Sequence, residues 1–141
     1  MQVEITLIND HSGLKGCFDA FQVLRPHLNL NDFLSQVDRQ REQGYQVLAL
    51  AENSRVVSVA GFRISEFLAW GKMLYIDDLS TLPEARSRGY GEQLLDWLIS
   101  HAKDNGCQAV HLDSGYGRHV AHKLYLKKGF LLSSHHLSLV L

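Results

Sequence analysis

Apolar and polar residues alternate along several short stretches of this chain, and a period of two is typical of a half-buried strand. Six segments have this character, and we predict strands at residues 3–8, 45–52, 55–64, 73–81, 108–114 and 130–141. A short polar turn at Asn53 and Ser54 separates the second segment from the third. These two segments are therefore predicted to form a hairpin.

Other segments carry apolar residues three and four positions apart, which is the spacing of one buried helix face. The predicted helices cover residues 14–24, about 31–43, 118–128 and the stretch between Gly91 and Gly106. Asn31 is a candidate N-cap of the second helix, and Gly44 is expected to end it. The resulting order, β-α-α-β-β-β-α-β-α-β, predicts an α/β (or α+β) fold, in which a mixed, mainly antiparallel sheet is flanked by four helices.

Length and charge narrow the classes of protein to which this chain can belong. At 141 residues, with no repeat, charge block or Pro/Gly/Ser linker, residues 1–141 are expected to form a single domain. The formal net charge of −1 argues against a general nucleic-acid binder. No apolar run reaches the ~18 residues of a membrane span, and Cys17 and Cys107 are expected to be free thiols in a reducing cytosol. We therefore expect a cytoplasmic protein that binds neither nucleic acid nor a membrane.

The segment RSRGYG, from Arg86 to Gly91, is the strongest chemical signal in the sequence. It lies between a predicted strand and a predicted helix, where main-chain N–H groups at the helix start can hold an anion. Gly89 and Gly91 lack the Cβ atoms that would keep a phosphate away from those donors. Arg86 and Arg88 add positive charge suited to phosphate. The turn is therefore predicted to hold the pyrophosphate of a phosphorylated cofactor.

A dinucleotide is excluded as that cofactor by the number and position of the glycines. The dinucleotide fingerprint G-x-G-x-x-G belongs early in a βαβ unit and is followed about twenty residues later by an acidic side chain. Here only two of the glycines are present, and they come late in the chain.

A second pattern, A-x-x-x-Y-x-x-x-G-F, is formed by Ala121, Tyr125, Gly129 and Phe130. Together with the R-x-x-G-x-G turn and the order of the elements, it resembles the GCN5-related N-acetyltransferase (GNAT) family. The resemblance covers nearly the whole chain and is strongest from about Tyr75 to Phe130. It implies that acetyl passes from acetyl-coenzyme A to a primary amine of a small molecule, by direct attack while both substrates are bound.

The resemblance also implies how coenzyme A is held. Its two phosphates are expected at the glycine turn, on Arg86, Arg88, Gly89, Tyr90 and Gly91. Its pantetheine arm is expected along residues 74–81, where main-chain groups of Leu79 and Thr81 lie near the thioester. A main-chain N–H there would polarise the acetyl carbonyl as negative charge develops on its oxygen.

Two side chains are candidates for the proton transfers. In the family, the tyrosine at the position of Tyr125 often acts as the acid, since a phenol with an ordinary pKa of about 10 can protonate the leaving thiolate. Asp78 is the candidate base, directly or through water, for the acceptor ammonium. An ordinary strand sends Asp77 and Asp78 to opposite faces, and a solvated or structural role for both is the alternative. Arg118 stands where many family members have asparagine, which leaves its role open.

The sequence says least about the acceptor. By the resemblance, the acceptor pocket involves the first two helices and the loop before the fourth strand, and the candidate substrate-binding residues are Arg25, Phe67 and Trp70. Arg25 could recognise a carboxylate, or be solvated as an arginine at a helix end usually is. Phe67 and Trp70 could line the amine site or a dimer contact, or could equally well pack within the fold.

Alternatives to this reaction and its partners stay open. The acceptor could be an amine of a protein or peptide, the acyl group could differ, or the chain could be a non-catalytic coenzyme A-binding regulatory module. No metal is expected, because no further ligands are signalled near His119 and His122. A homodimer is an expectation from the family only.

Overall fold

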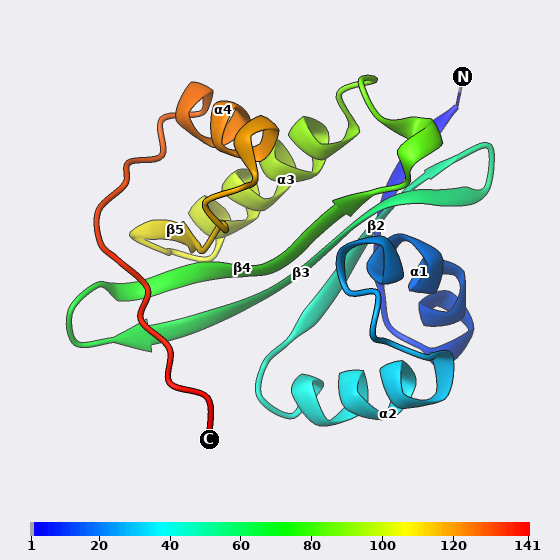
Figure 1. The fold of residues 1–141 in the computed structure, drawn as a ribbon, viewed down its shortest axis with the longest axis horizontal. Coiled ribbons are helices and arrows are strands. Elements are labelled where there is room, and N and C mark those ends of the chain that lie inside the picture. Colours follow the sequence, from blue (N-terminus) through cyan, green and yellow to red (C-terminus); the bar gives the residue numbers. More distant parts are fainter. Residues whose placement is uncertain (1) are drawn as a thin grey trace. The chain divides into compact units, whose positions relative to one another are not determined.

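The structure is a computed structural model that describes residues 2–141 (Figure 1). The chain divides into two compact units, one ending at His111 and the other spanning Leu112–Leu141. The first unit contains most of the sheet and three α-helices, and the second contains the last α-helix and the closing segment.

In the described part of the chain, the strands β1 (Val3–Ile8), β2 (Gln46–Glu52), β3 (Arg55–Phe67), β4 (Gly71–Thr81) and β5 (Ala109–Leu112) form one sheet. Their order is that of the chain, and β1 to β4 pair antiparallel with their neighbours. Asn53 and Ser54 connect β2 to β3 with φ values of 51° and 71°, as a two-residue hairpin turn requires. The predicted hairpin is confirmed. β3 and β4 are longer than predicted and form a second hairpin.

The described helices are α1 (His11–Leu24), α2 (Leu30–Arg41), the short 3-10 helix η1 (Pro83–Ala85), α3 (Tyr90–Asp104) and α4 (His119–Lys127). Asp10 caps α1 by accepting a hydrogen bond from the main-chain N–H of Gly13 at 2.7 Å. Asn29, rather than the predicted Asn31, caps α2, because its side chain accepts from the N–H of Asp32 at 3.0 Å. An N-cap must lie outside the helical conformation, and Asn31 is already inside the first turn.

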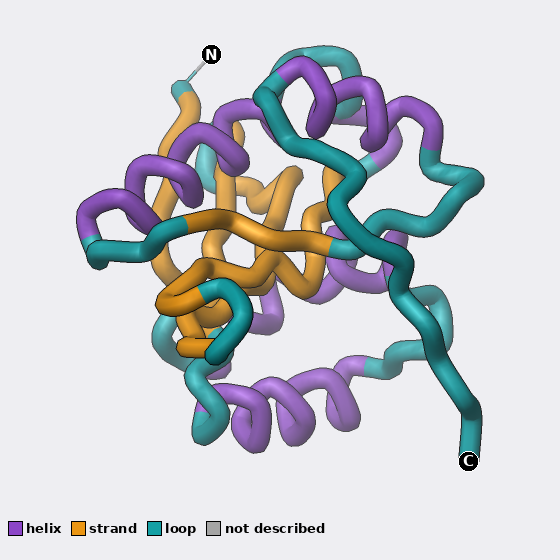
Figure 2. The backbone as a smooth tube through the Cα atoms, turned by 90° about the vertical axis from the view of Figure 1, so that its left-hand side faces the viewer, coloured by secondary structure: helices purple, strands orange, loops and turns teal. Residues whose placement is uncertain are grey.

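Helices of the first unit cover both faces of the sheet (Figures 1 and 2). Phe62 of β3 packs edge-on against Trp97 of α3 with ring centroids 6.2 Å apart. Gly61, its neighbour, faces Tyr45 on the side of α1 and α2. Successive strand residues point to opposite faces, so α3 lies across the sheet from α1. Each helix buries an apolar stripe, made by Leu14, Cys17 and Phe21 in α1 and by Leu94, Leu95 and Leu98 in α3.

β4 contains a β-bulge beside the middle of β3. Gly61 pairs with Asp78, and the next residue, Phe62, pairs with Ile76, so that Asp77 is an extra residue in β4. An extra residue interrupts the regular alternation of side chains and increases the local twist. The side chains of Asp77 and Asp78 therefore need not point to opposite faces of the sheet, as they would in an ordinary strand.

The predicted last strand is wrong. Residues 130–141 form neither helix nor strand. A strand is held by main-chain hydrogen bonds to a neighbouring strand. The Phe130 N–H donates to the Tyr125 carbonyl at the end of α4, and beyond it the described main chain of this segment has no such neighbour. Alternating Leu and Val residues favour an extended conformation, but they do not supply a partner.

Candidate active site

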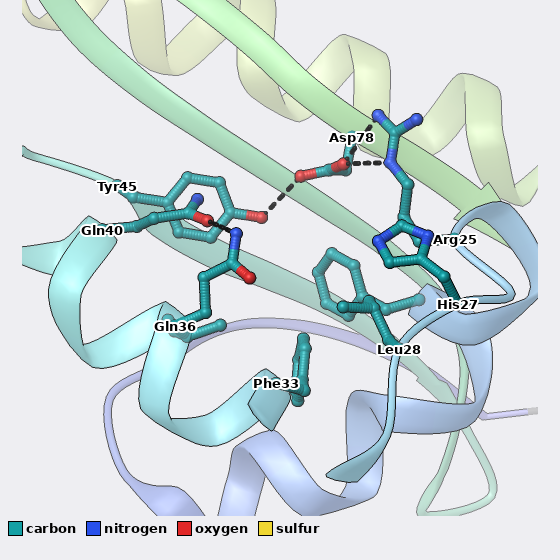
Figure 3. Close-up of a pocket in the computed structure, with 10 residues that line it drawn as sticks. Arg25, His27, Leu28, Phe33, Gln36, Gln40, Tyr45 and Asp78 are labelled. Atoms are coloured by element: carbon teal, nitrogen blue, oxygen red, sulfur yellow. Dashed lines mark hydrogen bonds and ion pairs between the residues drawn. The ribbon is translucent and has the colours of Figure 1, made fainter. Parts of the chain in front are cut away.

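A cavity of about 330 Å³ lies in the first unit between α1, α2 and the bulge of β4 (Figure 3). Its lining consists of Phe21, Arg25, His27, Leu28, Phe33, Gln36, Val37, Gln40, Tyr45 and Asp78. The structure thus brings together two residues singled out in the sequence, Arg25 and Asp78, although they come from different ends of the first unit's sequence.

Asp78 is held at the β4 end of the cavity by two partners from other elements. Nε of Arg25 donates to its Oδ1 at 3.1 Å, and the hydroxyl of Tyr45 donates to its Oδ2 at 2.7 Å (Figure 3). The Asp78 side chain is 14% exposed, so it meets the cavity without being open to bulk water. With a donor on each oxygen, this carboxylate has a fixed orientation.

The Tyr45 hydroxyl is buried and keeps its proton. Burial raises the pKa of Tyr45 well above its ordinary value, and the charge and hydrogen bond of Asp78 raise it further. A Cβ at Gly61 would lie 1.7 Å from the Tyr45 hydroxyl oxygen. Tyr45 therefore reaches Asp78 only because residue 61 has no side chain.

Asp77, the extra residue of the bulge, belongs to the same group of charges. Nε and Nη2 of Arg63 donate to its two oxygens at 3.2 and 2.7 Å. Burial raises the pKa of Asp77 in spite of that ion pair. The Arg63 guanidinium carbon also lies 5.4 Å from the centre of the Tyr45 ring. The expectation that Asp77 and Asp78 occupy opposite faces is therefore wrong, because the bulge removes the alternation.

Phe67 and Trp70 lie away from the cavity, at the far end of the hairpin between β3 and β4. Phe67 pairs with Gly71, and at about 3.3 Å per residue roughly 20 Å of strand separates that pair from Asp78. The Trp70 and Phe67 rings pack on each other with centroids 5.5 Å apart. The structure does not bring these two residues to Arg25 and Asp78.

Sequence reasoning missed three polar residues of the cavity, namely Gln36, Gln40 and Tyr45. Gln36 and Gln40 are one helical turn apart, which places them on one face of α2, but no local pattern shows what that face meets. Gly61 was an available signal for Tyr45, because a glycine inside a strand often marks a close approach.

The glycine turn before α3 leaves its main chain open. Gly89 precedes α3 with a φ of 79°, a left-handed conformation that glycine adopts without strain. No described side chain caps α3, and a Cβ at Gly89 would meet no atom within 4 Å. Open space beside uncapped N–H groups at a helix start fits a diphosphate.

The charged side chains of this turn already have partners in the protein. Nη1 of Arg88 donates to both oxygens of Glu52 at 3.0 and 2.8 Å, and the Tyr90 hydroxyl donates to the same carboxylate. The hydrogen bonds from Tyr90 and Arg88 lower the pKa of Glu52. Nε of Arg86 donates to the Thr81 carbonyl at 3.4 Å. The capacity of the turn to bind an anion therefore rests mainly on its main-chain donors.

A family model described as the acetyltransferase (GNAT) family matches residues 14–130, which include the cavity, the glycine turn and α4. This chain belongs to the GNAT acetyltransferase family. The resemblance predicted from the two sequence motifs is confirmed, and so is the fold class, with a mixed sheet and four helices.

Relatives of this GNAT protein include enzymes from several sources. YhdJ of Bacillus subtilis (strain 168), described as an uncharacterized N-acetyltransferase, is 33% identical over 114 residues, which are 79% of this chain and 80% of that protein. A GNAT family acetyltransferase from Staphylococcus aureus has a TM-score of 0.83 at 21% identity, covering 100% of both chains. Aminoglycoside N-acetyltransferase AAC(6')-Iy in complex with CoA has a TM-score of 0.86 at 14% identity, covering 99% of this chain and 94% of that one. At such identities, the two solved structures show the fold alone.

Leu79 and Thr81 follow the bulge on β4, where they pair with Ala60 and Ser58 of β3. The Thr81 hydroxyl is hydrogen-bonded to the Ser58 hydroxyl at 2.7 Å. A Cβ at Gly91 would lie 3.9 Å from Oγ1 of Thr81, so the end of β4 adjoins the glycine turn. Thr81 is therefore a neighbour of Gly91 in space, and the contacts of Leu79, Thr81 and the turn with coenzyme A stay a prediction.

Tyr125 lies on α4 in the second unit, with its ring centroid 5.8 Å from that of Phe130. Burial raises the pKa of Tyr125, and the nearby charge of Arg118 lowers it by less. The phenol therefore keeps its proton at neutral pH, as a proton donor must. Arg118 immediately precedes α4 without capping it through its side chain, and its role toward the cofactor stays a prediction.

Among residues 2–141, no group of three or more histidine, cysteine, aspartate or glutamate side chains is arranged to hold a metal ion. His119 and His122 lie with ring centroids 6.4 Å apart, edge to face. Within the same described residues, no helix combines the length and the apolar composition that a membrane span requires.

Proposed function

We propose that this GNAT protein acetylates a primary amine of a small molecule, with acetyl-coenzyme A as the donor. The position of Asp78 carries the proposal: a part-buried carboxylate lies at one end of a cavity of about 330 Å³ and directly precedes Leu79 on β4. By the family resemblance, the thioester is expected near Leu79. An amine drawn to Asp78 is therefore brought toward the acetyl group, and such alignment is a large part of the acceleration that the transfer needs.

Asp78 attracts the protonated amine and accepts its proton, directly or through a water molecule, which frees the nitrogen lone pair for attack. Arg25 and Tyr45 support this role because they orient the carboxylate from two sides. Oδ2 accepts the hydrogen bond from Tyr45 and has a second lone pair for the amine.

The glycine turn binds the diphosphate of the donor through the main-chain N–H groups around Gly89 and Gly91. The open space at Gly89 supports this assignment. Acetyl-coenzyme A supplies the acetyl group as a thioester, whose C–S bond breaks as the new C–N bond to the amine forms.

Tyr125 donates its phenolic proton to the leaving thiolate. Tyr125→Phe should therefore lower kcat by about a hundredfold, which is within the usual range for a general acid. The affinity for acetyl-coenzyme A, measured by calorimetry, should change by less than about twofold, since the hydroxyl acts in the chemical step. An unchanged kcat would remove Tyr125 from this role.

A screen that reports release of free thiol tests the function directly. The purified protein, acetyl-coenzyme A and a panel of primary amines should give amine-dependent release, and Asp78→Asn should slow it. Release with lysine peptides but with no small amine would favour a protein or peptide acceptor. Binding of acetyl-coenzyme A without release on any amine would favour a regulatory module.

A further inference from the structure

Aromatic and aliphatic side chains make up one side of the cavity. The rings of Phe21 and Phe33, which are 2% and 4% exposed, have centroids 5.2 Å apart and are tilted by 42°. Leu28 and Val37 line the cavity beside them. Such a surface favours a hydrocarbon or aromatic body, because a sugar or phosphate group placed there would lose hydrogen bonds to water without replacement.

The permanently charged side chains among the lining residues are one acid and its partner. Asp78 is the one carboxylate among the lining residues, and the Arg25 guanidinium lies 3.0 Å from it. Nη2 of Arg25 also donates to the main-chain carbonyl of Asp77 at 3.2 Å. The cavity therefore offers one carboxylate to an ammonium group and no carboxylate to a second ammonium group. An anionic ligand group would meet only the Arg25 guanidinium, which already has acceptors in the protein.

Two neutral amides complete the lining on the side of Tyr45. Nε2 of Gln36 donates to Oε1 of Gln40 at 2.9 Å, and Figure 3 shows this pair across the cavity from Arg25 and His27. The pair offers hydrogen bonds to a neutral polar group of the ligand, such as a ring hydroxyl, without adding charge.

We propose that the acceptor is a primary amine with a single positive charge and a compact apolar body, the class that arylalkylamines represent. This inference rests on the proposed function and adds the class of acceptor to it. The ammonium group lies at Asp78, and the body packs on Phe21 and Phe33. A cavity of about 330 Å³ is near the lower limit for ligand pockets, so it takes one ring with a short chain rather than an oligosaccharide.

Two matched pairs of amines test the class with the wild-type protein at saturating acetyl-coenzyme A. 2-Phenylethylamine and phenylalanine share a ring and differ by a carboxylate, whereas hexylamine and 1,6-diaminohexane share a chain and differ by a second amino group. We expect kcat/KM to be higher by about tenfold or more for the first member of each pair, since the added charge finds no partner. A second member that equals or exceeds its first would overturn the class.

Kanamycin, a polycationic amino sugar, serves as a third kind of acceptor. It distinguishes an error in the proposed acceptor class from an error in the proposed acetyltransferase function. Thiol release with kanamycin, but with neither 2-phenylethylamine nor hexylamine, would overturn the acceptor class and leave the acetyltransferase activity standing. If none of the amines gave thiol release, both the acceptor class and the acetyltransferase function would be overturned.

A charge placed in the lining provides a second, independent test. Gln36→Glu adds a second carboxylate to the cavity with almost no change in side-chain size. It should raise the ratio of kcat/KM for 1,6-diaminohexane to that for hexylamine by about fivefold, a moderate effect because residue 36 is exposed and water screens its charge. Gln43→Glu, at an exposed residue just beyond α2 and outside the lining, is the matched control and should leave the ratio unchanged. The same ratio in both variants would place the acceptor elsewhere.

Discussion

The glycine turn before α3 and the cavity between α1, α2 and β4 are built from different parts of the chain. The turn presents main-chain N–H groups of consecutive residues, and Gly89 keeps the space beside them free. The cavity is lined by side chains from two helices, from the connection between them, from the residue before β2 and from the bulge of β4. One region is a local property of the segment RSRGYG, whereas the other exists only in the folded chain.

This contrast predicts that the two regions fail in different ways. At the turn, any added side chain occupies the space that an anion needs, whatever the chemical nature of that side chain. In the cavity, the orientation of Asp78 depends on groups from distant parts of the sequence, so a substitution at one position acts through others. The predictions below separate the two cases.

The largest expected effect is on the activity of the enzyme, and it should differ between the two adjacent carboxylates of the bulge, Asp77 and Asp78. Asp78→Asn should lower kcat/KM for the acceptor by about a hundredfold or more, as expected for the loss of a general base. Asp77→Asn should lower it by less than about tenfold, because Asp77 does not line the cavity and is paired with Arg63. Steady-state kinetics of both variants provide the measurement, and equal losses would mean that Asp78 has no special position.

Gly61→Ala tests how far the cavity depends on Tyr45. The added Cβ would lie 1.7 Å from the Tyr45 hydroxyl oxygen, so the ring must move and release Asp78. We expect a loss of about 1–3 kcal/mol in the free energy of unfolding, as for other overpacked sites. Gly16→Ala, on α1 where a Cβ would meet no atom within 4 Å, should instead gain about 0.5–1 kcal/mol. Denaturant unfolding compares the two, and equal stability of Gly61→Ala and wild type would contradict the position of Tyr45.

Gly89→Val tests whether the turn binds the diphosphate, and a control variant with similar backbone strain is available. Its side chain would fill the open space at the start of α3, so the KM for acetyl-coenzyme A should rise by about tenfold or more. Gly44→Val is the control, since Gly44 has a φ of 91° against 79° for Gly89 and equally open surroundings. Both variants should lose stability from the positive φ, but only Gly89→Val should change this KM. A similar KM in the two variants would mean that the diphosphate binds elsewhere.

The smallest effect concerns α1, the helix that supplies Phe21 to the cavity. Burial raises the pKa of the Cys17 thiol from 9.0 to about 12. Between these values the unfolded chain loses the thiol proton and the folded chain keeps it, so the free energy of unfolding falls as the pH rises above 9.0. At about pH 10 the loss amounts to roughly 1.4 kcal/mol. In Cys17→Val, the free energy of unfolding should lack this part of the decline between about pH 8 and pH 10, as measured by denaturant unfolding. An identical decline in the variant and the wild type would argue against burial of the Cys17 thiol under α1.

Local pattern predicted those parts of the fold that local chemistry decides. The first strand follows from its alternation, the hairpin at Asn53 and Ser54 from its turn residues, and α3 from its helical spacing. The bulge at Asp77 could not be predicted from the sequence, because it depends on the register in which β3 and β4 pair. Residues 130–141 show the converse, since their alternation is that of a strand and their main chain has no described strand partner.

The candidate site divides in the same way. The turn at Arg86 to Gly91 could be recognised because its residues are contiguous, whereas Arg25 and Asp78 could be named singly but not as an ion pair between helix and strand. Phe67 and Trp70 were chosen from a segment expected to be a loop beside the pocket. The turn is present but shorter, and it lies at the far end of a longer hairpin because β3 continues to Phe67. No local signal sets where a strand stops.

The central claim is that the cavity holds the amine and the glycine turn holds the acetyl donor, and two KM values measured on two variants test it most directly. With 2-phenylethylamine as acceptor, Asp78→Asn should impair the kinetic constants of the amine and leave the KM for acetyl-coenzyme A within about twofold of wild type. Gly89→Val should do the reverse. If Asp78→Asn raised the KM for acetyl-coenzyme A as much as Gly89→Val does, the two regions would not be separate sites and the claim would be contradicted.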